Sequence, residues 1–88
     1  MKIGEIYLIE LDYYYIIRIL KLEPHPSQAF LAIFDMIDYP ITYTICKKET
    51  HTIYWLKEFI VKPLKRKDWY KAVRKCNENR RNIFNQIQ

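Results

Sequence analysis

Glycine and serine are almost missing from this chain of 88 residues, with Gly4 and Ser27 as the single example of each. Loops that cradle phosphates or dinucleotides need several glycines for close backbone approach. The nucleophile elbow of many hydrolases needs a serine between two glycines. The scarcity therefore excludes these motifs and favours a small binding domain over an enzyme.

Long apolar runs and paired cysteines are missing as well. The longest unbroken apolar run covers residues 29–34, whereas a membrane span needs roughly 18 residues or more. Charged side chains such as Lys2 and Glu5 interrupt the N-terminal segment, so we expect no signal peptide and a cytoplasmic protein. Cys46 and Cys76 form no CxxC pair, so we expect reduced thiols and no metal or other cofactor.

The composition that remains is that of a folded domain. Hydrophobic residues make up 50% of the chain and aromatic residues 16%, far more than a disordered chain contains. A chain of this length can bury one small core and no second one. We therefore expect a single domain over residues 1–88, with strands within 1–62 and a basic amphipathic helix over 68–86.

Charge divides the chain into two unequal parts. Residues 1–61 hold six Lys or Arg against eight Asp or Glu, whereas residues 62–88 hold nine Lys or Arg against Asp68 and Glu78 alone. A basic segment of this strength is typical of chains that bind phosphates or an acidic protein surface. The alternative is an ordinary solvated helix face.

Alternating β-branched and aromatic residues predict about five short strands. We expect them over residues 3–11, 13–22, 29–37, 41–46 and 50–61. Periodicity leaves strand or helix open for 29–37, where the length and the flanks favour a strand, and a short helix is the alternative for the last range. Prolines and polar residues predict a loop over 23–28, turns over 38–40 and 47–50, and an end to the last strand at Pro63. The range 13–22 is apolar on both faces, as in a strand that is covered on both sides of a small closed barrel.

The C-terminal segment has helical periodicity instead. From Asp68 onward, the apolar residues fall in one arc of about 120° on a helical wheel, and charged residues lie opposite. We expect Asp68 to be the N-cap and 69–84 to form the longest helix. The predicted fold is mainly β: a small SH3-like barrel of about five strands, whose edges this C-terminal amphipathic helix helps to cover.

The candidate partner-binding residues are cations of the linker and the outward helix face, together with two tyrosines of the second strand. They are Lys65, Arg66, Lys67, Lys71, Arg74, Lys75, Arg81, Tyr13 and Tyr15. Trp69 lies on the apolar arc, which favours core packing over stacking on a base. Arg80 also falls in that arc, and we expect it to pair with a carboxylate of the sheet.

Groups that could support catalysis are few and scattered. His25 with Ser27 lacks any residue that would orient either side chain, and His51 with Glu49 is expected to be a turn pair. Asp35 and Asp38 could form a pair of carboxylates, but at the end of a strand we expect them to cap a turn. We therefore expect no catalytic activity.

The opening Ile3-Gly4-Glu5-Ile6-Tyr7-Leu8-Ile9-Glu10-Leu11 resembles the first strand of small SH3-like barrels. Growth-inhibitor endoribonuclease toxins begin similarly, but they carry an Arg-Pro-rich second strand that this chain lacks, so their activity is not implied. A polymorphic-toxin immunity family is similar over about the first 40 residues, at Gly4-Glu5-Ile6-Tyr7, residues 13–18 and Phe34-Asp35. This resemblance implies a non-catalytic inhibitor that binds a protein. Phage-encoded inhibitors of bacterial defence, of the anti-CRISPR type, share that size and style.

The sequence thus predicts a cytoplasmic, non-catalytic protein that inhibits a protein partner by occupying its surface. The partner would be acidic, such as a toxin or a nucleic-acid-handling defence complex, and no membrane is involved. The alternative is a nucleic-acid-binding module that uses residues 62–81, and a third possibility is a ribonuclease-like toxin.

Overall fold

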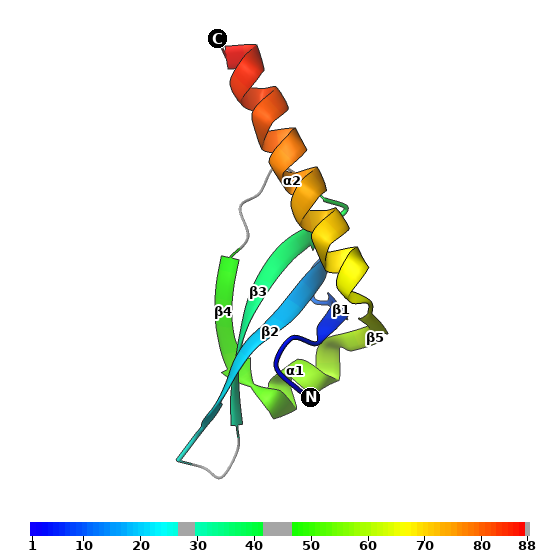
Figure 1. Ribbon diagram of the computed structural model, residues 1–88. Helices are drawn as coiled ribbons and strands as arrows, with labels where there is room; N and C mark the ends of the chain where they lie inside the picture. The colour runs from blue at the N-terminus through cyan, green and yellow to red at the C-terminus, as the bar shows by residue number, and fades with distance from the viewer. Residues whose placement is uncertain (27–29, 42–46, 88) are drawn as a thin grey trace.

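The computed structural model describes residues 1–26, 30–41 and 47–87, with side chains up to residue 82. Five strands form one antiparallel sheet: β1 (Ile6–Glu10), β2 (Tyr14–Pro24), β3 (Phe30–Tyr39), β4 (Lys47–Thr52) and β5 (Ile60–Leu64). A short helix α1 (Ile53–Phe59) joins β4 to β5, and a long helix α2 (Arg66–Ile87) follows β5 (Figure 1).

The sheet has the strand order β4-β3-β2-β1-β5, so β1 lies between β2 and β5 while β4 and β5 are the edges. The prediction of a mainly β fold with about five strands and a C-terminal helix is confirmed. The sheet, however, is open between β4 and β5. Helix α2 crosses one face, and its C-terminal half projects beyond the strands (Figure 1), which lengthens the molecule to 51 × 23 × 23 Å.

Both faces of the sheet are covered, as the apolar pattern of the second strand predicted. On one face, buried side chains of β1, β2 and β3 pack against Leu56 of α1: Ile9, Ile17, Ile19, Ala32 and Phe34. On the other face, Ile6, Ile16 and Ile37 pack against Trp69 and Ala72 of α2. The structure therefore has three layers, with the sheet between a short and a long helix.

A bulge in β2 changes which face its later residues meet. The β2–β3 register shifts between Ile19 and Lys21, after which Leu22 pairs with Ala32. Leu22 consequently packs against the core on the α1 side, although strict alternation had placed it with Ile16. An extra residue on one strand of an antiparallel pair reverses the faces that follow it.

Trp69 packs α2 against the sheet, which confirms the prediction that this residue belongs to the core. Its side chain is 2% exposed, and the guanidinium of Arg18 lies 4.9 Å from its ring centroid. Nη2 of Arg18 also donates to Oδ2 of Asp35 at 3.3 Å, across the β2–β3 pair. Arg80, in contrast, is exposed and takes part in none of the ion pairs among the described side chains, so its predicted pairing is wrong.

Two predictions around the fourth strand are wrong. Residues 47–50 were expected to be a turn, but they begin β4, and their charges suit an edge strand that must not pair with another chain. Residues 50–61 were expected to be a strand, but Thr52 ends β4 and caps α1 by accepting a hydrogen bond from the Trp55 amide at 3.2 Å. Apolar side chains at Ile53 and Leu56 then share one helical face.

Smaller corrections concern element ends. β2 and β3 extend into the expected loop and turn, through Pro24 and Tyr39. Pro63 lies inside β5 rather than ending it, because an edge strand tolerates a missing N–H. Asp68 is not the N-cap: α2 starts at Arg66, and Oδ2 of Asp68 accepts from the Lys65 amide at 2.7 Å.

The strand expected over 41–46 falls almost wholly outside the described residues, as do Ser27 and Cys46. Cys76 is a buried thiol on α2. In the part of the chain that the structure describes, none of the helices has the length and hydropathy of a membrane span.

Candidate functional site

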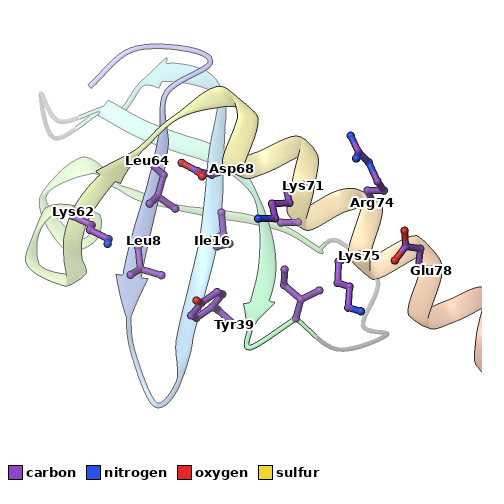
Figure 2. A pocket seen from close by; sticks show the side chains of 12 residues that line it. Leu8, Ile16, Tyr39, Lys62, Leu64, Asp68, Lys71, Arg74, Lys75 and Glu78 are labelled. Atoms are coloured by element: carbon purple, nitrogen blue, oxygen red, sulfur yellow. The ribbon is translucent and has the colours of Figure 1, made fainter.

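A groove of about 560 Å³ lies between α2 and the sheet (Figure 2). Strands β1, β2 and β5 supply its floor, and the first three turns of α2 form one wall. The lining residues are Leu8, Ile16, Tyr39, Ile41, Lys62, Leu64, Asp68, Lys71, Ala72, Arg74, Lys75 and Glu78. This volume is within the usual range for small-molecule and peptide-anchoring sites.

Strand register explains the apolar floor. Leu8 pairs with Ile16 on one side and with Lys62 on the other, so these three side chains share one row on the α2 face. In the next row, Ile6 pairs with both Arg18 and Leu64. Helix α2 covers much of that second row through Trp69 and Ala72, but it leaves Leu8 only partly buried. Leu8 and Leu64, both partly buried, are the more accessible part of the floor, whereas Ile16 and Ala72 are 5% and 1% exposed.

Cations stand on both sides of this floor. Lys62 comes from β5, whereas Lys71 and Lys75 come from successive turns of α2. Figure 2 shows Lys71 extending from the helix toward the sheet, while the guanidinium of Arg74 lies on the side of α2 away from the floor. All four cationic side chains belong to exposed residues.

Two carboxylates also line the groove, but one of them is engaged. Asp68 accepts the Lys65 amide at the start of α2, where a negative charge also complements the helix dipole. Glu78 is exposed at the other end, four residues after Arg74, a spacing at which opposite charges attract. Four cations against two carboxylates leave the groove positive.

Tyr39 lines the end of the groove where β1 turns into β2, and it is 49% exposed. It pairs across the strands with Tyr14, which in turn pairs with Glu10. Hydrogen bonding to Glu10, together with the negative charge of that carboxylate, raises the pKa of Tyr14 above its ordinary value. The groove therefore ends at one aromatic side chain, beside a second tyrosine that lies outside the lining.

The structure divides the predicted basic residues into two sets. Lys71, Arg74 and Lys75 line the groove. Lys65, Arg66, Lys67 and Arg81 are exposed but lie outside its lining. The first set forms a concave site with the sheet, whereas the second set extends the positive surface along α2 and its linker.

The two predicted tyrosines lie away from this groove. Tyr13 is 70% exposed in the turn before β2. Tyr15 packs against the core on the α1 side, and its hydroxyl donates to Oδ1 of Asp12 at 3.0 Å. Burial, Asp12 and the charge of Asp38 all raise the pKa of Tyr15. The tyrosines on the α2 face are instead Tyr14 and Tyr39, which the sequence analysis did not select.

Sequence reasoning also missed the apolar part of the site. Leu8 and Ile16 were predicted only as strand residues, and Leu64 lay beyond the last predicted strand. The pairing of Leu8 with both Ile16 and Lys62 depends on β5 lying beside β1. Nothing in the local sequence specifies that neighbour, so the missing signal was the strand order.

The remaining candidates do not form a second centre. His51 stacks on Trp55 with ring centroids 3.7 Å apart, and its Nε2 lies 3.9 Å from Oε2 of Glu49. Asp35 is engaged by Arg18. Over the described side chains, His, Cys, Asp and Glu form no group of three or more that could hold a metal ion.

Comparison of the chain with family models, with curated proteins and with solved structures gives no match.

Proposed function

We propose that this protein is a non-catalytic binding module that occupies the surface of an acidic protein partner and thereby inhibits it. The observation that carries the proposal is the positive groove with an aliphatic floor between α2 and the sheet. Such a surface matches a partner segment that presents both carboxylates and apolar side chains. Charge complementarity would guide association, and the floor would retain the complex.

The lining favours a protein over a nucleic acid. Proteins that bind single-stranded nucleic acid stack the bases on aromatic side chains. The apolar residues that line this groove are instead aliphatic or small: Leu8, Ile16, Leu64 and Ala72. Asp68 and Glu78 would also repel a phosphate backbone that followed the groove. Tyr39 is the aromatic ring that the lining contains.

Nucleic-acid binding is the second candidate, and a different set of residues favours it. Lys65, Arg66, Lys67 and Arg81 are exposed without lining the groove, and a protein with a net charge of +5 attracts polyanions in general. We propose that such binding is weak, sequence-independent and strongly reduced by salt.

We also propose that the fold is an open form of the SH3-like barrel. The order β4-β3-β2-β1-β5 places the last strand beside the first, which is the pairing that a small barrel of five strands requires. The short α1 between β4 and β5 fills the α1-side core with Leu56. We base the proposed inhibitory role on the resemblance of the first 40 residues to toxin immunity proteins.

The test is capture of the partner by the immobilised full chain from a lysate, with and without nuclease, at 50 and 200 mM salt. The groove variant is Lys62→Glu/Lys71→Glu/Lys75→Glu. The control variant, Lys2→Glu/Lys47→Glu/Lys57→Glu, makes the same charge change at exposed residues outside the groove. Each exposed ion pair contributes roughly 0.2–1 kcal/mol, so reversing three should weaken binding by about tenfold or more.

We expect the wild-type chain to capture a protein partner whether or not the lysate is treated with nuclease. The groove variant should fail to capture this partner, and the control variant should still capture it. The activity of the captured partner should fall when the wild-type chain is added, and it should not fall when the groove variant is added. Capture that disappears on nuclease treatment would establish the nucleic-acid alternative. Equal capture by both variants would show that the groove is not the binding site.

A further inference from the structure

We infer that the groove recognises a short acidic segment through one large apolar side chain with carboxylates on both sides of it. This inference rests on the proposed function and deepens it, because it states what part of a protein partner enters the site.

The floor can bury one large side chain without a change in the fold. Leu8 and Ile16 are directly paired on β1 and β2, and Ala72 on α2, which presents only a methyl group, packs in the same cluster. Ile16 and Ala72 are 5% and 1% exposed, so the partly buried Leu8 and Leu64 supply the accessible apolar surface of the groove. The groove volume of about 560 Å³ exceeds what a single methyl or hydroxyl group would need, and no described carboxylate lies on the floor itself, since Asp68 and Glu78 belong to α2.

The lysines determine where negative charge is favoured. Lys62 pairs with Leu8 and so stands at the β5 side of the floor, whereas Lys71 and Lys75 stand at the helix side (Figure 2). A segment that lies across the floor therefore meets positive charge both before and after its anchor residue. A partner with carboxylates on one side only would leave one lysine group unmatched.

The occupant must lie on the face of the sheet rather than extend it. Groups that add a strand to a sheet need free N–H donors along the edge. The groove lies on the α2 face of the sheet, and β5, the edge strand beside it, contains Pro63, which has no N–H to donate. Recognition therefore depends on side chains and charge, and it does not require the ligand to be extended.

The probe is an acetylated peptide, Glu-Asp-Glu-Leu-Glu-Asp-Glu, titrated into the full chain at 50 mM salt. Matched peptides replace the central Leu with Ser, or replace every acidic residue with Lys or Arg. We expect the Leu peptide to bind about tenfold more tightly than the Ser peptide, and we expect no binding of the basic peptide. Methyl resonances of Leu8, Ile16, Leu64 and Ala72 should shift on binding, while those of Ile9 and Ile19, on the α1 side, should not.

Protein variants separate this inference from the proposed function. The Lys62→Glu/Lys71→Glu/Lys75→Glu variant should no longer bind the Leu peptide, and the matched control variant should bind it with unchanged affinity. Equal affinity for the Leu and Ser peptides, with binding still lost in the groove variant, would overturn the anchor while leaving an acidic partner in place. Capture of a protein by the groove with no binding of the acidic Leu peptide would also overturn the anchor. If the groove variant altered neither peptide binding nor protein capture, both proposals would be wrong.

Discussion

Replacing Trp69 with alanine tests the central packing contact of this fold. The ring is 2% exposed among Ile6, Ile16, Ile37 and Ala72. Burial of roughly 200–250 Å² of aromatic surface at about 25 cal/mol per Å² gives an upper value of about 5–6 kcal/mol. Measured losses for Trp→Ala in cores are about 3–5 kcal/mol, below this upper value because the unfolded chain already buries part of the same surface. We expect a loss in that range.

A second contribution comes from Arg18. Its guanidinium lies 4.9 Å from the Trp69 ring centroid, and Nε of Arg18 is a buried atom without a hydrogen-bond partner among the described residues. A partly desolvated cation–π contact is worth about 0.5–2 kcal/mol. A double-mutant cycle of Trp69→Ala with Arg18→Met should therefore give a coupling energy of about 1 kcal/mol.

The assay is urea unfolding followed by far-ultraviolet circular dichroism. Domains of this size have about 5–15 kcal/mol of stability, so Trp69→Ala should lower the midpoint severely or prevent folding, and the milder Trp69→Phe keeps the measurement possible. Tyr70→Ala is the matched control, since this neighbour on α2 is 50% exposed and should cost less than about 1 kcal/mol. Equal losses for Trp69→Ala and Tyr70→Ala would refute the view that Trp69 holds α2 on the sheet.

Three further predictions concern a turn, the tyrosines and the histidines. Gly4 has a φ of +89° with open space around the position of a Cβ, so Gly4→Ala should cost about 1–2 kcal/mol in urea unfolding through backbone strain alone; an unchanged midpoint would contradict this. Burial raises the pKa of Tyr7 and of Tyr15, so the stability that their neutral hydroxyls provide should be present below about pH 10 and lost as the pH rises above it. Tyr15→Phe should reduce that alkaline loss, and equal pH profiles would count against it. If the protein has no catalytic function, His25→Ala and His51→Ala should leave inhibition of the partner intact whenever circular dichroism shows a folded chain.

How far the sequence predicted the fold depends on whether a pattern was local. Alternation identified β1 and β2, and helical periodicity identified α2, because each pattern records which side chains face the core. The length and the flanks of an apolar run identified β3, since its periodicity was ambiguous. The prediction was wrong at 47–61, where an edge strand, a capped helix and a second edge strand follow one another within eighteen residues. Edge strands often carry charged residues, which prevent pairing with another chain. Lys47 and Lys48 therefore looked like residues of a polar turn. The short α1 depends on the Thr52 cap and on the space that Leu56 fills.

The candidate site was only half predictable for a related reason. The cluster of cations on α2 was evident in the sequence. Such a cluster does not show by itself whether the helix face is merely solvated or forms one side of a binding groove. What distinguishes Lys71 and Lys75 from Lys67 or Arg81 is the apolar floor beside them. That floor exists because β5 pairs with β1 and brings Lys62 and Leu64 next to Leu8 and Ile6. Such neighbours are far apart in sequence, and no local periodicity encodes them.

The same geometry explains how one helix can both complete the core and line the groove that we propose as a binding site. Trp69, Ala72 and Cys76 are buried, and Lys71 and Lys75 each precede one of these residues by a single position, about 100° around the helix. The lysines therefore lie outside the packed stripe, on the flank of α2 beyond Ala72 that lines the groove. Both lysines are exposed, and an exposed charge pair contributes little by itself. The apolar floor beside them would therefore supply much of the affinity for the proposed acidic ligand, which is why the charges and the floor are needed together.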